Sequence, residues 1–210
     1  MRRISAVLAI FFLIVQSAAA QPLTLLALGD SLTAGYGLQP SDAFPVKLEA
    51  ALRARGHDVR VINSGVSGDT AVDGQARLDW ALSEDVDAVL VELGANDALR
   101  GLPPPQAEDA LDKVLTTLAS RSLPALLIGM RAPPNMGPDY VAAFDTMYAR
   151  LAEKHGVPLY PFFLDGVAAD ASLNQADGIH PNPDGVDVIV APILPSVEGL
   201  IGQAAARRQP

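Results

Sequence analysis

The chain has 210 residues, of which 50% are hydrophobic and 19% are charged; this balance suits one folded domain and excludes a disordered protein. Its formal net charge of −9 disfavours nucleic acids and anionic membrane surfaces as partners, and favours a neutral or apolar small molecule. No cysteine is present, which excludes disulfides, thiolate nucleophiles and zinc–thiolate sites.

The first 20 residues are typical of a secretory signal peptide. Arg2 and Arg3 precede an apolar run over residues 4–15, and the alanines at 18–20 suit cleavage by a signal peptidase. The alternative is a retained membrane anchor, but a span needs about 20 apolar residues. We therefore expect residues 1–20 to be a cleaved signal peptide. Residues 21–210 are expected to form a single exported domain, periplasmic or secreted, with no stable membrane anchor.

Apolar segments rich in β-branched residues alternate with segments of helical periodicity in the rest of the chain. The predicted strands cover residues 23–28, 59–63, 88–93, 125–130 and 159–163. The predicted helices cover residues 43–55, 71–83, 106–121, 139–155 and 184–201, with a frayed tail at 202–210. Because the strands are almost continuously apolar, helices must cover both faces of the sheet. The pattern predicts a three-layer α/β/α domain with a five-stranded parallel sheet.

Small and polar residues gather after the predicted strands, at the edge where open parallel sheets bind their ligands. Three segments follow the first three strands, and a fourth lies near the end of the chain: Gly29-Asp30-Ser31, Ser67-Gly68-Asp69, Gly94-Ala95-Asn96-Asp97 and Asp177-Gly178-Ile179-His180-Pro181.

His180 is the best candidate for a catalytic base among the three histidines. His57 and His155 lie at predicted helix ends, where a polar or cationic ring suits the free carbonyl groups. Asp177 precedes His180 by three residues, a spacing that lets the carboxylate reach the imidazole on a tight turn. Taken alone, the pair fits a solvated loop histidine better than a catalytic one.

Ser31 follows the first predicted strand directly, so its hydroxyl is expected at the carboxyl edge of the sheet. The free amides of the helical turn that follows favour negative charge. The alternatives are a phosphate-binding loop or a simple helix-capping serine. The segment lacks the lysine of a P-loop and the Gly-x-Ser-x-Gly of an elbow-type hydrolase.

Two further groups are candidates for an oxyanion hole beside the Ser31 amide. They are the Gly68 backbone N–H and the Asn96 side-chain amide. Each is also a common turn residue when considered separately. The catalytic hypothesis depends on all four segments meeting at one edge of the sheet.

These four segments resemble, in order, the four sequence blocks of the SGNH (GDSL) hydrolase family, over essentially the whole chain after residue 20. Further runs are similar to the thioesterase and lysophospholipase members of that family: Val91-Glu92-Leu93-Gly94, Leu99-Arg100-Gly101, Pro161-Phe162-Phe163, and Arg131 leading to Asn135 and Gly137. The resemblance implies a flavodoxin-like fold and broad action on esters and thioesters. It also implies that Ser31 is the nucleophile, that His180 is the base oriented by Asp177, and that Ser31, Gly68 and Asn96 form the oxyanion hole.

The proline-rich segment after the fourth predicted strand is expected to line an acyl pocket through Arg131, Pro133, Pro134, Asn135 and Met136. Its apolar character favours medium or long acyl chains. Ala95 and residues 132–137 differ from the pattern of similar family members, which affects the acyl preference and not the reaction.

The expected reaction is two-step acyl transfer through an acyl-enzyme on Ser31, carried out by a monomer on a small acyl ester or thioester. It needs no metal and no cofactor. Two alternatives stay open: a carbohydrate O-acetylesterase on the same scaffold, and a non-catalytic lipid- or sugar-binding protein.

Overall fold

A computed structural model describes residues 21–82 and 85–208, so the predicted signal peptide lies outside the described residues. Five parallel strands form one sheet in the order β2-β1-β3-β4-β5. The strands are β1 (Leu23–Gly29), β2 (Val59–Gly65), β3 (Ala88–Glu92), β4 (Ala125–Ile128) and β5 (Leu159–Tyr160). This is the strand order of flavodoxin-like sheets, and it confirms the predicted fold class.

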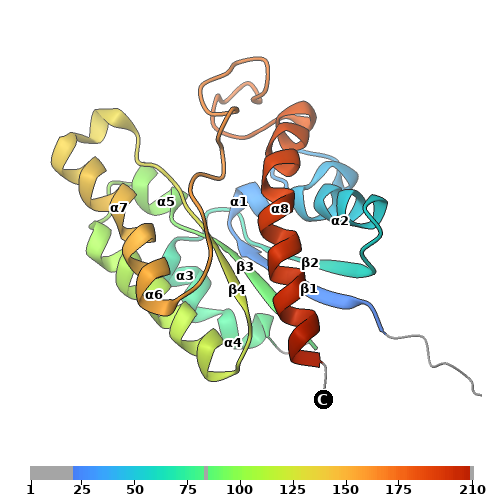
Figure 1. Cartoon of the computed structure of the whole chain (residues 1–210). Coiled ribbons are helices and arrows are strands. Elements are labelled where there is room, and N and C mark those ends of the chain that lie inside the picture. Colours follow the sequence, from blue (N-terminus) through green and yellow to red (C-terminus); the bar gives the residue numbers. More distant parts are fainter. Residues whose placement is uncertain (1–20, 83–84, 209–210) are drawn as a thin grey trace, which may run out of the picture.

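Helices cover both faces of the sheet (Figure 1). One face carries α1 (Ser31–Ala34), α2 (Phe44–Ala54) and α8 (Pro183–Arg208). The other carries α3 (Ala71–Ala76), α4 (Leu78–Ala81), α6 (Pro104–Ser120) and α7 (Pro138–His155). The short helix α5 (Ala95–Leu99) and two 3-10 turns, η1 (Pro40–Asp42) and η2 (Pro134–Met136), lie in the connections.

The central strands form the core of the domain. Leu25, Leu28, Val89 and Leu127 are fully buried between the two helical layers. Burying one such side chain stabilises the fold by roughly 1.5–3 kcal/mol. The rigid sheet therefore presents its carboxyl edge, where β1 and β3 lie side by side and their connections diverge, as a fixed platform for a site.

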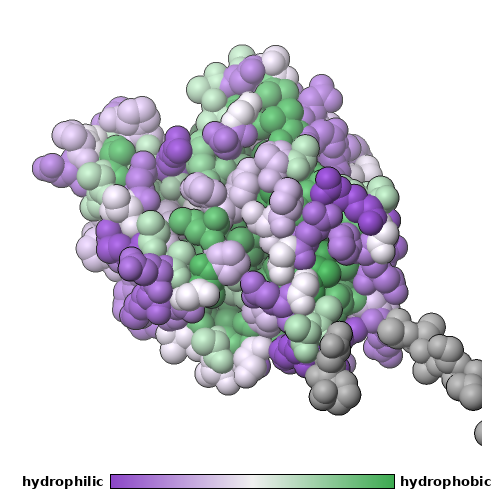
Figure 2. Space-filling view, viewed as in Figure 1, coloured by the Kyte–Doolittle hydropathy of each residue, from purple (hydrophilic) through white to green (hydrophobic). Residues whose placement is uncertain are grey.

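α8 is long and apolar enough to cross a membrane, by length and composition alone, with a mean hydropathy of 1.5 in its most apolar window. Half of that window is buried inside the domain, and the helix packs on α2 and on the sheet. α8 therefore has the burial expected of the core helix of a folded domain. On the face of the domain shown in Figure 2, hydrophobic patches are interrupted by hydrophilic residues.

Two predicted strands are too long at their carboxyl ends. β4 ends at Ile128 instead of residue 130, and β5 ends at Tyr160 instead of residue 163. The segments that follow β4 and β5 lie so close together that a Cβ on Gly129 would be 2.4 Å from Pro161 O. Pro161 also lacks the N–H that would extend the ladder.

Two predictions about the helices are also wrong. The helix expected over 71–83 is divided at Arg77, whose side chain donates to Gly29 O at 2.9 Å and to Asp69 Oδ2 at 2.6 Å. The predicted frayed tail is helical as far as Arg208. The Arg208 guanidinium bonds both oxygens of Asp87 at 2.6 Å, which fixes the end of α8.

Candidate active site

Ser31 lies at the end of β1, where the chain turns from the sheet into α1. Asp30 caps this short helix by accepting a hydrogen bond from the Leu32 N–H at 3.0 Å. The turn requires a glycine before it, because a Cβ on Gly29 would come within 2.2 Å of Thr33 Oγ1. The Ser31 hydroxyl is thereby held at the carboxyl edge of the sheet, in the wall of a cavity.

His180 and Asp177, on the loop before α8, form a hydrogen-bonded series with Ser31. His180 Nε2 is 2.9 Å from Ser31 Oγ, and His180 Nδ1 is 2.7 Å from Asp177 Oδ2. Because an ionised carboxylate only accepts hydrogen bonds, Nδ1 carries the ring proton of neutral His180. Nε2 is then free to accept the proton of the Ser31 hydroxyl, which is the tautomer that a general base requires.

Backbone groups hold the Asp177 carboxylate in its ionised form. Asp177 Oδ1 accepts hydrogen bonds from the N–H groups of Ile179 at 2.9 Å and His180 at 3.0 Å. These two bonds, the one from Ile179 first, and the bond from the His180 ring lower the pKa of Asp177 to about 2. Asp177 therefore stays negative beside His180 at neutral pH.

Two contacts hold the His180 loop against the Ser31 loop. In the first, Gln175 Nε2 donates to Tyr36 O at 2.7 Å; the same group also donates to Pro181 O within its own loop, at 3.0 Å. The Tyr36 ring packs on the His180 ring at a centroid distance of 4.7 Å. These contacts restrict the imidazole to the orientation in which Nε2 faces Ser31. Gln175 and Tyr36 carry no local signal in the sequence, because they join loops 139 positions apart.

Two of the predicted oxyanion donors are backbone N–H groups that are free to donate. Those of Ser31 and Gly68 have no hydrogen-bond acceptor within the described part of the chain. The loop that carries Gly68 is joined to the end of β1 by a 3.0 Å hydrogen bond from the Val66 N–H to Gly29 O. Gly68 has a φ of 90°, a left-handed conformation that favours glycine. Unpaired N–H groups of this kind are what an oxyanion hole needs.

Asn96, the third predicted oxyanion donor, lies in the first turn of α5 and lines the same cavity. Its Nδ2 donates to Asp69 O at 3.0 Å and to Asp30 Oδ2 at 3.1 Å. Both amide hydrogens are therefore paired in the free protein. A substrate oxyanion can take the hydrogen that faces Asp30 only by sharing or replacing that contact.

Two buried carboxyl groups lie beneath Ser31. Burial raises the pKa of Asp30 to about 6, although hydrogen bonds from Leu32 and Asn96 act to lower it. Glu92 accepts a 2.7 Å hydrogen bond from Thr33 Oγ1, and its other oxygen has no partner within the described residues. Burial, and then the nearby charge of Asp30, raise the pKa of Glu92 well above its usual range. The arrangement favours one negative charge on the pair, on Asp30, where it contacts Asn96.

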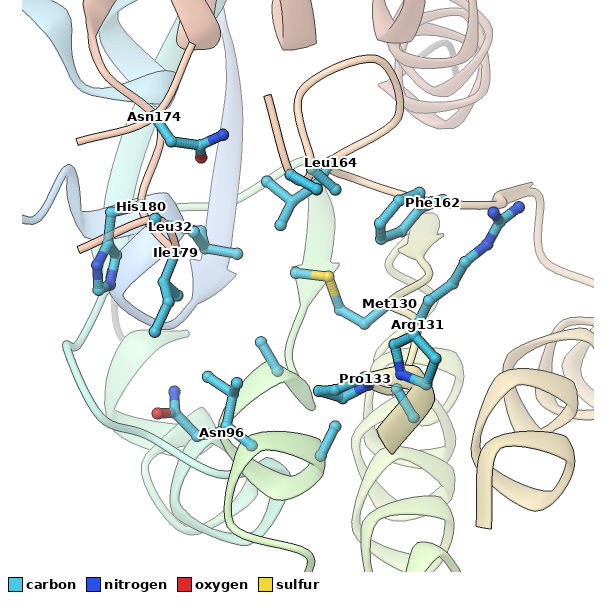
Figure 3. A pocket seen from close by; sticks show the side chains of 18 of the residues that line it. Leu32, Asn96, Met130, Arg131, Pro133, Phe162, Leu164, Asn174, Ile179 and His180 are labelled. Carbon is cyan, nitrogen blue, oxygen red and sulfur yellow. The ribbon is translucent and has the colours of Figure 1, made fainter. Parts of the chain in front are cut away.

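An apolar cavity of about 620 Å³ opens beside Ser31 and His180. This volume is within the range of small-molecule sites. Figure 3 shows Asn96 and His180 at one end of the cavity, with Phe162 and Arg131 at the other. Its main apolar side chains come from five different segments: Leu32, Leu99, Met130, Pro133, Phe162 and Ile179. The Arg131 guanidinium lies over the Phe162 ring, 4.8 Å from its centroid.

The predicted substrate loop contributes only part of this lining. Arg131, Pro133 and Pro134 line the cavity, whereas Asn135 and Met136 do not. The 3-10 turn η2 directs Met136 elsewhere: a Cβ on Gly101 would lie 2.9 Å from its Cε. Phe162, Leu164 and Ile179 complete the wall of the cavity. The consecutive apolar residues at 162–164 were the sequence signal that could have indicated part of this lining.

The other two histidines face carboxylates away from this cavity. His57 Nε2 is 3.2 Å from Glu198 Oε1, and His155 Nε2 is 2.6 Å from Asp112 Oδ1. Over residues 21–82 and 85–208, no group of three or more His, Asp or Glu side chains is placed to hold a metal ion.

A hydroxyl, an imidazole and a carboxylate in hydrogen-bonded series, at the carboxyl edge of a parallel sheet and beside an apolar cavity, define a serine hydrolase with an α/β/α fold. The chain belongs to the GDSL-like lipase/acylhydrolase family, whose model matches residues 27–188. Its curated relatives are esterases and thioesterases, and the chain is accordingly a serine ester hydrolase.

Relatives of known name match most of the chain. It is 40% identical to "Esterase TesA" of Pseudomonas aeruginosa over 190 residues, which are 90% of this chain and 94% of that protein. It is 41% identical to "Thioesterase 1/protease 1/lysophospholipase L1" of Escherichia coli over 176 residues, 83% of each chain. The crystal structure of AlinE4, an SGNH-hydrolase family esterase, superposes with a TM-score of 0.73 at 45% identity, covering 86% of this chain and 97% of that one.

Proposed function

We propose that the protein hydrolyses carboxylic esters and thioesters of medium or long acyl chains through an acyl-enzyme on Ser31. Acyl esters, acyl-CoA and lysophospholipids belong to this class. The observation that carries the proposal is the series from Ser31 Oγ to His180 Nε2, 2.9 Å, and from His180 Nδ1 to Asp177 Oδ2, 2.7 Å. Loss of one of these groups would indicate a binding protein, but all three are present.

In the first step Ser31 Oγ attacks the substrate carbonyl carbon, and its proton moves to His180 Nε2. The carbonyl oxygen becomes an oxyanion that accepts hydrogen bonds from the N–H groups of Ser31 and Gly68 and from Asn96. When the tetrahedral intermediate collapses, the bond to the leaving group breaks and His180 returns the proton to that group. Water then attacks the acyl-enzyme by the same route and releases the acid.

Asn96→Ala is expected to lower turnover by about 10²–10³-fold, the usual effect of removing one oxyanion donor. The matched control is Asn63→Ala, because Asn63 lies near the carboxyl end of β2 and its side-chain amide also donates to a backbone carbonyl, Ala34 O, at 3.3 Å. The measurement is kcat on one p-nitrophenyl ester together with the melting temperature. An Asn96→Ala enzyme that keeps near-normal kcat would exclude Asn96 as an oxyanion donor.

The apolar cavity predicts that kcat/KM rises with acyl chain length. Each buried CH₂ contributes about 0.8 kcal/mol, or about fourfold in kcat/KM, until the cavity is full. Ala168 lines the cavity, so Ala168→Phe should lower the rate on octanoyl esters more than on acetyl esters. Ala143→Phe, at an exposed position on α7, is the control.

A panel of p-nitrophenyl esters from acetyl to dodecanoyl, with acyl-CoA and acetylated xylan beside it, measures this preference. Faster turnover of acetyl esters than octanoyl esters, with acetylated xylan faster still, would favour the carbohydrate O-acetylesterase instead.

The proposal includes export of a monomer with cleavage before Gln21. The order of basic, apolar and small residues in positions 1–20 supports export, and N-terminal sequencing of the secreted protein tests it.

A further inference from the structure

Side chains from α5 and the residue after it hold the loop at 66–71 at three nearly consecutive points. The contacts are Arg100 Nη2 to Gly68 O at 2.7 Å, Asn96 Nδ2 to Asp69 O at 3.0 Å, and Ala71 N to Asp97 Oδ2 at 2.8 Å. Asp97 is fully buried, and Asn96 has a second partner in Asp30. Arg100 is the exposed member of the three, so it can be replaced without opening the core.

Gly68 is the residue of this loop with the widest backbone freedom, because it is the only glycine in residues 66–71. Glycine adopts positive and negative φ with similar ease, so local sterics do not fix the direction of its N–H group. Among the described residues, the Arg100 guanidinium is the only hydrogen-bond donor to the Gly68 carbonyl. Holding that carbonyl limits the rotation of the Gly68 backbone and, through it, the direction of the adjacent N–H.

The guanidinium also brings a positive charge to this position. A Cβ on Gly68 would lie 3.5 Å from Arg100 Nη2, so the guanidinium covers the α-carbon as well as the carbonyl. Within the described part of the chain, Arg100 forms no ion pair with a carboxylate, although the charges of Asp73 and Asp97 are close enough to act on it. The positive charge of Arg100 is therefore only partly neutralised, and it lies beside Gly68, whose N–H is taken to donate to the oxyanion.

We propose that Arg100 is a positioning residue for acyl transfer: its guanidinium holds the Gly68 carbonyl, and this restricts the Gly68 backbone so that the Gly68 N–H points at the substrate oxyanion. The inference rests on the proposed function, since it takes Gly68 as an oxyanion donor. Arg100 acts through Gly68 and does not itself contact the reacting atoms. The expected loss is smaller than that caused by removing a donor outright.

The test compares Arg100→Ala and Arg100→Lys with the wild-type enzyme on p-nitrophenyl octanoate. We expect Arg100→Ala to lower kcat by about tenfold, against about 10²–10³-fold for a lost donor, with little change in KM. Lysine, which keeps the charge and one donor, should recover part of the rate. Guanidinium added below denaturing concentrations should also restore Arg100→Ala, relative to sodium chloride at the same ionic strength.

An inhibitor separates positioning from a merely structural role. Ser31 Oγ adds to the carbonyl carbon of an octyl trifluoromethyl ketone, its proton moves to His180, and the ketone oxygen becomes an oxyanion. Octanoate, by contrast, only fills the cavity. The Ki of the ketone should rise by the same factor as kcat falls, and the Ki of octanoate should stay unchanged. Arg207→Ala, at an exposed position near the end of α8, should change neither constant and should not respond to guanidinium.

An Arg100→Ala enzyme with kcat within twofold of the wild type overturns the inference. So does a loss of kcat without a matching loss of affinity for the ketone. Failure of the proposed function is a different result: the wild-type enzyme would then hydrolyse no ester in the panel, and Ser31 would not react with the ketone.

Discussion

Ser31→Ala is expected to abolish ester hydrolysis, with a fall in kcat of about 10⁶-fold as in other serine hydrolases that lose the nucleophile. Ser31 Oγ has His180 Nε2 as its hydrogen-bond partner at 2.9 Å, so alanine leaves the base with no proton to accept. The α1 turn should persist, because its cap is the Asp30 side chain. A fluorophosphonate probe should label the wild-type protein once and the variant not at all.

The matched control is Ser41→Ala, at an exposed position in η1, which should keep both labelling and activity. Circular dichroism checks that each variant is folded. Persistent labelling of a folded Ser31→Ala protein would show that another side chain is the nucleophile.

Asp177→Asn is expected to lower kcat by about 10⁴-fold, because it should place the wrong tautomer of His180 beside Ser31. The backbone N–H groups of Ile179 and His180 require an oxygen at the Oδ1 position. The amide nitrogen of the variant must then face His180 Nδ1 and donate to it. His180 would carry its proton on Nε2 and could not accept the proton of Ser31.

The pH–rate profile gives a second measurement of the same role. The wild-type rate should rise from acid to neutral pH, since a general base must be neutral to accept the proton of Ser31. Asp177 does not contribute to this rise, because its pKa of about 2 keeps it ionised throughout. Its lowered pKa stabilises the folded loop above about pH 4, and that stabilisation is lost as pH falls toward 2.

Asp170→Asn is the matched control, because Asp170 also caps a turn in the same loop, through Ser172. It should leave kcat and the pH profile unchanged. Near-equal rates for the wild type and Asp177→Asn, with both folded, would instead indicate that a His180–Ser31 pair suffices.

The sequence predicts those parts of the fold that depend on local patterns. Continuous apolar runs mark the strands because burial on both faces is a property of each strand by itself. The ends of β4 and β5 were missed because Gly129 and Pro161 limit each other across two strands. Arg77 likewise divides a helix through contacts with Gly29 and Asp69, which no helical periodicity reveals.

The site was predictable where its chemistry is carried by rare residues or by recognised segments. The contacts that orient those residues were not, because they join distant segments: Asp30 and Asn96 are 66 positions apart. Asp30 also departs from the usual pattern, in which charged side chains stay at the surface, because it is fully buried. Its pKa of about 6 in the folded protein means that stability decreases as pH rises through that value. Such a group is expected at a functional site, where a buried charge lowers the stability of the fold but is needed at that position.

The contact that ends α8 has a practical consequence for presenting the enzyme on a solid support. Arg208 donates to Gln21 O at 2.7 Å and to Pro22 O at 3.1 Å, so both ends of the described chain meet at the amino edge of the sheet. The acyl cavity lies at the opposite, carboxyl edge, where Ser31 follows β1. A resin, bead or cell-surface anchor attached at Gln21 or Arg208 would therefore leave the entrance facing the medium, accessible even to micelles and other bulky substrates.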